Sequence, residues 1–187
     1  MEKKTDLRII KTRRQIQTAF LNLLKENKFD TISVSQITQE AMISRSTFYD
    51  HYEDKFALLD SIYEMINSEF KKIVTDYFSK EDRDFNMELA HKILTYVMKN
   101  AAMFKILMSA NVPVRDLFMP LKDILQPYCM EYLEKHPNKY KLDSEFVVEV
   151  YSSIIFISFR WIVLHENPMD VVKIVAMGDQ VRKMFYE

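Results

Sequence analysis

Glycine is almost absent from this chain, with a single copy, Gly178, in 187 residues. Phosphate-binding loops and dinucleotide fingerprints need several glycines at fixed spacing, so the sequence excludes both kinds of nucleotide site. One glycine and five prolines also leave few turns for a sheet, and no strand-turn-strand pattern occurs. The composition therefore predicts an all-α protein.

Cysteine is equally scarce, because Cys129 is the single copy. It cannot form an intramolecular disulfide, which fits a reducing compartment. The four histidines are scattered, without the spacing of a zinc site, and nothing in the sequence activates Cys129 as a nucleophile. We therefore expect no metal, no cofactor and no enzymatic activity.

No targeting or membrane segment is expected. Met1 to Arg14 is charged rather than apolar, unlike a signal peptide. The uncharged run from Val150 to Phe159 is too short to span a bilayer. These observations predict a cytoplasmic protein without membrane contact.

Charge is unevenly distributed, although the net charge is −1. Six basic residues face two acidic ones over the first fourteen positions: Lys3, Lys4, Arg8, Lys11, Arg13 and Arg14 against Glu2 and Asp6. Terminal charges are usually just solvated. Beside a DNA-binding motif, however, such a patch is typical of contact with the phosphate backbone.

Helix-capping signals between residues 31 and 59 predict two short helices joined by a tight turn. Ser33 and Gln36 form a capping box at the start of the first, which ends near Ala41. Ser44 can cap a second helix that runs from Arg45 to about residue 51. This layout is a helix-turn-helix, whose second helix enters the DNA major groove.

The flanking helices complete a small domain. Upstream, an apolar stripe at helical spacing predicts a longer opening helix: Ile16, Ala19, Phe20, Leu23 and Leu24. Downstream, Asp54 caps a helix that begins at Lys55, and Phe48 and Tyr52 should turn toward the shared core. We therefore place a DNA-binding domain at residues 1–54 and a regulatory domain at residues 55–187.

The segments SVSQIT, AMISRSTFYDHY and DKFALL resemble the N-terminal domain of TetR-type (TetR/AcrR) transcriptional regulators. The resemblance covers the first third of the chain. Two positions depart from the family pattern, because Met42 and Ser46 stand where glycine is common. Met42 follows the helix end, where a left-handed conformation would cost about 1 kcal/mol unless the turn is built differently.

The candidate DNA contacts lie on the two short helices and at the start of the next. Arg45 is the best base reader, because arginine donates bidentately to guanine. Ser46 and Thr47 are placed on bases or phosphates. Tyr49, Lys55, His51, Ser33 and Ser35 are placed on phosphates, with capping alone as the alternative for the serines and a surface role for His51. The predicted set is Ser33, Ser35, Ser44, Arg45, Ser46, Thr47, Tyr49, His51 and Lys55.

The remaining two thirds predict a larger helical domain for ligand binding and dimerisation. Asp143 opens a helix to about His165 that is apolar over nearly its whole circumference, and a second copy of the chain would cover its outer face. A central core helix of a monomer is the alternative. The resemblance also implies dimerisation through the last two helices. The predicted dimer contacts are Tyr151, Ile154, Ile155, Phe159 and Ile162.

A ligand pocket is implied by the resemblance, and the sequence says little about it. Methionine and aromatic side chains can line an adaptable apolar pocket, although ordinary core packing is the simpler reading for each. The candidates are Met98, Phe104, Met108, Phe118, Tyr128, Tyr151 and Phe156. A small apolar ligand or a protein partner would fit this domain.

Together these features predict a homodimeric transcriptional repressor that binds a palindromic double-stranded DNA operator and is released by a ligand. The alternative is a helical protein-interaction or coactivator module of the same fold with weak or no DNA binding. Met42 is the feature that favours this alternative.

Overall fold

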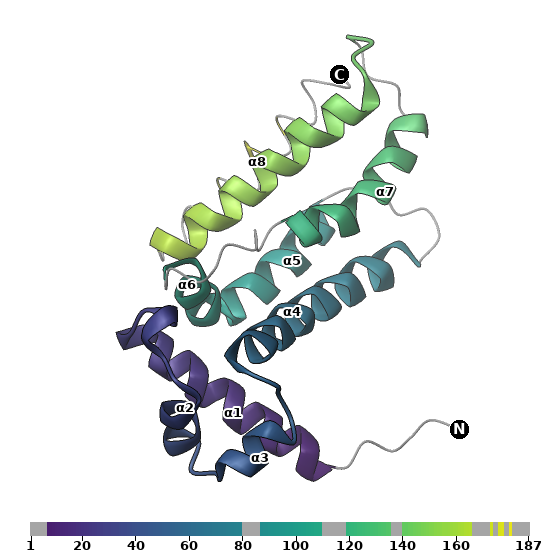
Figure 1. Cartoon of the computed structure of the whole chain (residues 1–187). Coiled ribbons are helices and arrows are strands. Elements are labelled where there is room, and N and C mark those ends of the chain that lie inside the picture. The colour runs from purple at the N-terminus through teal and green to yellow at the C-terminus, as the bar shows by residue number, and fades with distance from the viewer. Residues whose placement is uncertain are drawn as a thin grey trace, which may run out of the picture. The chain divides into compact units, whose positions relative to one another are not determined.

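The structure, a computed structural model, describes residues 7–79, 87–109, 119–135 and 140–165, together with residues 173, 176, 177 and 180. Every regular element in these ranges is helical, which confirms the predicted all-α class. The elements are α1 (Leu7–Glu26), the short 3-10 helix η1 (Phe29–Thr31), α2 (Val34–Glu40), α3 (Arg45–Tyr49), α4 (Lys55–Phe78), α5 (Met87–Lys99), α6 (Ala101–Ser109), α7 (Met119–Lys135) and α8 (Ser144–His165) (Figure 1).

The described residues form two compact units. The first contains residues 7–66 and 105–109, and the second contains the rest. The boundary predicted after residue 54 coincides with the start of α4, whereas the first unit continues through the first half of that helix.

The first unit is built around the apolar stripe of α1. Ile16, Ala19, Phe20 and Leu24 are buried as predicted, while Leu23 is half-buried. The Phe20 ring packs edge-to-face on Phe29, with ring centroids 6.1 Å apart. Fully burying side chains of this size stabilises the fold by about 1.5–3 kcal/mol each. The helix-turn-helix therefore rests on a continuous apolar core.

Three capping residues set the helix starts, as the sequence predicts. Ser33 forms the full capping box with Gln36 at the start of α2. Ser44 accepts the Thr47 N–H at the start of α3. Asp54 Oδ1 accepts the N–H groups of both Phe56 and Ala57, each at 2.8 Å, at the start of α4. These bonds satisfy donors that the helix itself leaves unpaired.

The second unit packs α8 against α7 and α5 (Figure 1). The inner face of α5 is buried at Leu89, Ile93 and Val97, and Tyr96 is half-buried. α7 continues through Pro127 as one helix.

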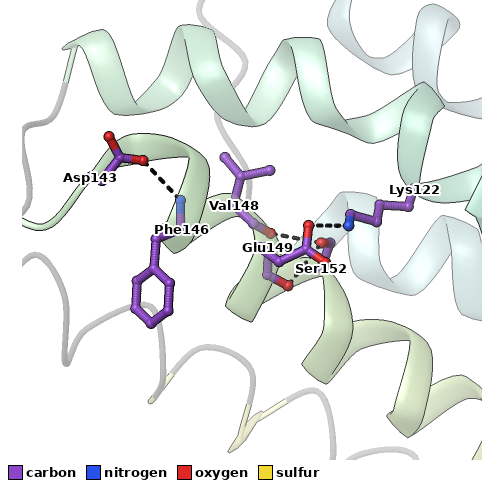
Figure 2. A network of polar contacts seen from close by, with 6 residues as sticks. All are labelled: Lys122, Asp143, Phe146, Val148, Glu149 and Ser152. Atoms are coloured by element: carbon purple, nitrogen blue, oxygen red, sulfur yellow. Dashed lines mark hydrogen bonds and ion pairs between the residues drawn. The ribbon is translucent and has the colours of Figure 1, made fainter.

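Polar contacts anchor the beginning of α8. Asp143 Oδ1 accepts the N–H groups of Glu145 and Phe146, as the predicted cap requires. Lys122 on α7 forms an ion pair with Glu149 on α8, and the Ser152 hydroxyl donates to the Val148 carbonyl at 2.7 Å (Figure 2). α8 has 22 residues and contains the whole uncharged run from Val150 to Phe159.

Among the described residues, α8 alone is long and apolar enough to cross a membrane by length and composition. Its most apolar stretch has a mean hydropathy of 1.8, and half of that stretch is buried within the protein. Core helices of soluble proteins meet the same criterion, so a single such helix is weak evidence for a membrane span.

Candidate nucleic-acid interface

The turn between α2 and α3 adopts a complete helix-terminating motif around Met42. The Met42 N–H donates to the Gln39 carbonyl at 3.1 Å, and the Ile43 N–H donates to the Thr38 carbonyl at 3.0 Å. This is the Schellman pattern, which places the residue after the helix end in the left-handed region. Met42 has φ 52° and its side chain is 89% exposed. The turn therefore keeps the geometry that glycine normally provides.

The start of α3 carries a cluster of three hydroxyl groups. Ser44 Oγ accepts the Thr47 N–H at 3.0 Å and lies 2.8 Å from both Ser46 Oγ and Thr47 Oγ1. Ser44 thus caps α3 and also fixes the two hydroxyls that follow. Ser44 and Ser46 are exposed, whereas Thr47 is half-buried. The serine at position 46 therefore adds an exposed, oriented hydroxyl group.

α3 has one face in the core and one face in solvent. Phe48 is fully buried and Tyr52 is nearly so, as predicted. Arg45 is exposed, and the Tyr49 ring is 56% exposed while packing edge-to-face on Phe48. Within the described part of the chain, no hydrogen bond or ion pair occupies the Arg45 guanidinium. Both side chains are therefore free to meet a partner.

The remaining candidates on this surface differ in availability. The Ser33 hydroxyl is engaged with Gln36, which matches the capping alternative. Ser35 is exposed on α2, and His51 is half-exposed beside the Tyr52 ring, with ring centroids 6.4 Å apart. Ser35 and His51 can therefore reach a bound polyanion more readily than Ser33.

Lys55 requires a correction. The sequence places its ammonium on a DNA phosphate, but in the structure Lys55 Nζ donates to three backbone carbonyls at residues 29, 30 and 32. An ammonium has three N–H donors, so none remains for a phosphate. The expected phosphate contact is therefore not supported in this conformation.

One buried polar atom lacks a partner in the described residues. The Tyr52 hydroxyl is enclosed without a hydrogen bond, although its ring packs against Phe48 at a centroid distance of 5.8 Å. A buried hydroxyl without a partner destabilises a protein.

The predicted ligand-pocket residues do not gather around a described cavity. Phe104 and Phe156 are buried core residues, Met98 and Met108 are half-buried, and Tyr128 stacks on Phe78. Phe118 and the Tyr151 side chain lie outside the described residues. The second unit instead has a groove of about 760 Å³ between α4 and α5, lined by Ile73, Asp76, Tyr77, His91, Lys92, Thr95, Tyr96 and Lys99.

The predicted dimer contacts on α8 also need correction. Phe159 and Ile162 are buried in the core of their own chain, so neither is available to a second copy. Ile154 is half-buried, and the side chains of Tyr151 and Ile155 lie outside the described residues. The exposed apolar residues are instead Phe146, Ile157 and Trp161, at 54%, 68% and 51% exposure. We call these three, with half-buried Val150 and Ile154, the outer α8 face.

The positions of two buried serines explain why the exposed face of α8 was predicted wrongly. Ser152 and Ser158 face the core, and each hydroxyl donates to the carbonyl four residues earlier, of Val148 and Ile154. A serine bonded within its own helix can be buried without an unsatisfied group. Sequence reasoning treats serine as polar and therefore could not orient this helix.

No catalytic chemistry stands out in the described residues. No group of three or more histidine, cysteine or acidic side chains suited to a metal occurs there. Burial raises the pKa of the Cys129 thiol to about 12, so it is protonated and a poor nucleophile at neutral pH.

Curated relatives are similar to the chain in sequence, although no family model matches it. An uncharacterised HTH-type transcriptional regulator, YxbF of Bacillus subtilis (strain 168), is 30% identical over 153 residues, which is 78% of this chain and 39% of the relative. The HTH-type dhaKLM operon transcriptional activator DhaS of Lactococcus lactis is 37% identical over 65 residues, 35% of this chain and 33% of the relative. The matched part thus spans well under half of either relative.

Solved structures share the fold over almost the whole chain. A TetR transcriptional regulator from Streptococcus agalactiae has a TM-score of 0.67 at 24% identity, covering 96% of this chain and 97% of its own. A SmeT–triclosan complex has a TM-score of 0.74 at 15% identity, covering 94% and 92%. Its motif and its sequence relatives are those of helix-turn-helix transcriptional regulators, and its fold is that of TetR-type regulators.

Proposed function

We propose that this protein is a sequence-specific DNA-binding transcriptional regulator that acts as a homodimer on a palindromic operator. The observation that carries the proposal is that α3 has one face buried in the core and the other exposed to solvent. Phe48 fixes the helix in the core, while Arg45, Ser46 and Tyr49 remain exposed on the surface that a major groove would meet.

The exposed side chains divide into base readers and phosphate contacts. Arg45, at the first position of α3, donates to guanine O6 and N7. Ser46 and Thr47 follow on the same turn with hydroxyls already oriented by Ser44. Tyr49, together with Ser35 and His51, contacts phosphates, which fix the register of the protein on the duplex. The basic residues of α1 add attraction that does not depend on sequence.

Dimerisation occurs through the outer α8 face. A contiguous apolar patch exposed on a soluble protein is typical of an interaction surface. Exposed Glu149, which also pairs with Lys122 of its own chain, and exposed Arg160 lie along the same flank of this face, eleven positions apart. If a second copy packs antiparallel, face to face and centred near Ile154, Glu149 of each chain meets Arg160 of the other. This self-complementarity is what a two-fold interface requires.

A small apolar ligand acting on the second unit would release the operator, as expected of a repressor. The SmeT–triclosan complex supports ligand binding by this fold. In the present chain, the groove between α4 and α5 is a candidate entry site for the ligand. Two tyrosine side chains line it, together with Lys92 and Lys99. The relative DhaS is named as a transcriptional activator, so activation is the other possible direction of regulation. Measuring transcription from the target promoter with and without the protein distinguishes repression from activation.

The alternative, a protein-interaction module without DNA binding, loses its main support. It rested on Met42, and the turn around Met42 has the full pattern of terminating hydrogen bonds. No described feature of α3 blocks access to a major groove.

A gel-shift experiment with the DNA that flanks the gene tests the proposal. We expect a specific complex that survives excess random DNA and weakens as salt increases, because released counterions drive phosphate binding. A protein that binds this DNA no more tightly than random DNA would contradict sequence-specific regulation.

A further inference from the structure

Lys55 joins the first turn of α4 to the segment that leads into α2. Its Nζ lies 2.9 Å from the Phe29 carbonyl oxygen, 3.1 Å from that of Asp30 and 2.8 Å from that of Ile32. The same nitrogen lies 4.7 Å from the centroid of the Phe29 ring. Lys55 is thus held from several directions by residues more than twenty positions earlier in the chain.

The three carbonyls stand immediately before the start of the helix-turn-helix. Ile32 directly precedes Ser33, whose capping box begins α2, and both Phe29 and Ile32 are buried. At the other end, Asp54 caps α4 and so fixes the backbone that carries Lys55. The ammonium therefore links the first turn of α4 to the residues that directly precede α2.

We infer that Lys55 is a positioning residue whose ammonium holds residues 29–32, and through them α2 and α3, in the orientation that DNA binding requires, without itself contacting a phosphate. This inference rests on the proposed function. Donating to three carbonyls that converge on one atom suits a tetrahedral ammonium. A guanidinium spreads its donors in a plane and cannot reproduce this arrangement.

Two substitutions separate positioning from phosphate contact. Lys55→Met removes the charge and the hydrogen bonds, and Lys55→Arg removes only the three-carbonyl geometry. Positioning predicts that both variants lose more affinity for the operator than for random DNA, with the salt slope of Lys55→Met unchanged. Phosphate contact predicts instead that Lys55→Arg binds like wild type and that Lys55→Met loses about 0.9 unit of slope. The second pattern would overturn the inference.

Lys25→Met is the matched control, because Lys25 is an exposed lysine of the same unit whose ammonium donates to the side chain of Asn22. This variant reports the effect of losing one positive charge while the three hydrogen bonds of Lys55 remain. Titrations at several salt concentrations give the slopes, and thermal unfolding shows that each variant is folded.

Amide hydrogen exchange in the free protein tests, independently of DNA, whether Lys55 holds residues 29–32. The N–H groups of Thr31 and Ile32 donate within η1, at 3.1 Å each, and should exchange faster in both Lys55 variants than in Lys25→Met. Unchanged exchange would overturn the inference even if DNA binding falls. If wild-type protein binds no DNA, the proposed function fails, and faster exchange alone would show that Lys55 holds this segment.

Discussion

The side-chain amide of Gln15 on α1 donates a hydrogen bond to the carbonyl of Ala41 at 2.5 Å. Ala41 is the C-cap of α2 and directly precedes the left-handed Met42, so α1 holds the turn at the residue where the chain changes direction. The geometry of the turn is therefore imposed by hydrogen bonds around it and not by the residue that occupies it. Methionine is tolerated there at some cost in stability.

Met42→Gly should increase the free energy of unfolding by about 1 kcal/mol, because glycine takes the left-handed conformation without a steric penalty. Chemical denaturation measures the change. Met42→Ala is the control, since it removes the same exposed side chain but keeps the β-carbon. If alanine stabilises as much as glycine, exposure of the methionine is the cause and not its backbone conformation.

Tyr49→Phe and Tyr52→Phe each remove a phenolic oxygen, three residues apart, with different expected effects. Loss of the exposed Tyr49 hydroxyl should weaken binding to all DNA sequences by about 0.5–1.5 kcal/mol and leave stability unchanged. Loss of the buried, unpartnered Tyr52 hydroxyl should leave stability unchanged or raise it by about 1 kcal/mol. A clear loss of stability in Tyr52→Phe would reveal a hidden partner for that hydroxyl.

Arg45→Ala should weaken operator binding by about 1–3 kcal/mol and relax the preference at one base pair in each half-site. Binding measured on operators with single base-pair changes gives both quantities. An equal loss on random DNA would make Arg45 a phosphate contact instead of a base reader.

Ile157→Glu should give monomers and abolish operator binding, because it places a charge at the most exposed position of the outer α8 face. Light scattering measures the mass, and a folded recognition unit is checked by circular dichroism. Gln126→Glu, which adds the same charge at an exposed position of α7, is the control. Ile162→Glu is unsuitable because Ile162 is 1% exposed and the variant would unfold.

A charge reversal tests the proposed packing of two α8 helices. Arg160→Glu should weaken the dimer by juxtaposing like charges with Glu149, and adding Glu149→Arg should restore it. Failure of the double variant to recover would argue against the antiparallel arrangement while leaving the outer face itself as the interface.

Local signals in the sequence predicted the local structure well. Ser33, Ser44 and Asp54 each cap the helix that was expected to follow, because a cap depends on residues within one turn. Features that depend on distant residues were not predictable. Lys55 turns toward carbonyls more than twenty positions away, and the orientation of α8 is set by serines that bond within their own helix.

A hydroxyl-radical footprint of the wild-type protein on the DNA flanking its gene tests the central claim most directly. A homodimeric helix-turn-helix regulator predicts two protected patches related by a two-fold axis, with centres about 34–36 Å apart or a multiple of that distance. The same footprint should be lost in Arg45→Ala at an equal protein concentration. A single patch, or no protection at concentrations that saturate the gel shift, would contradict the account.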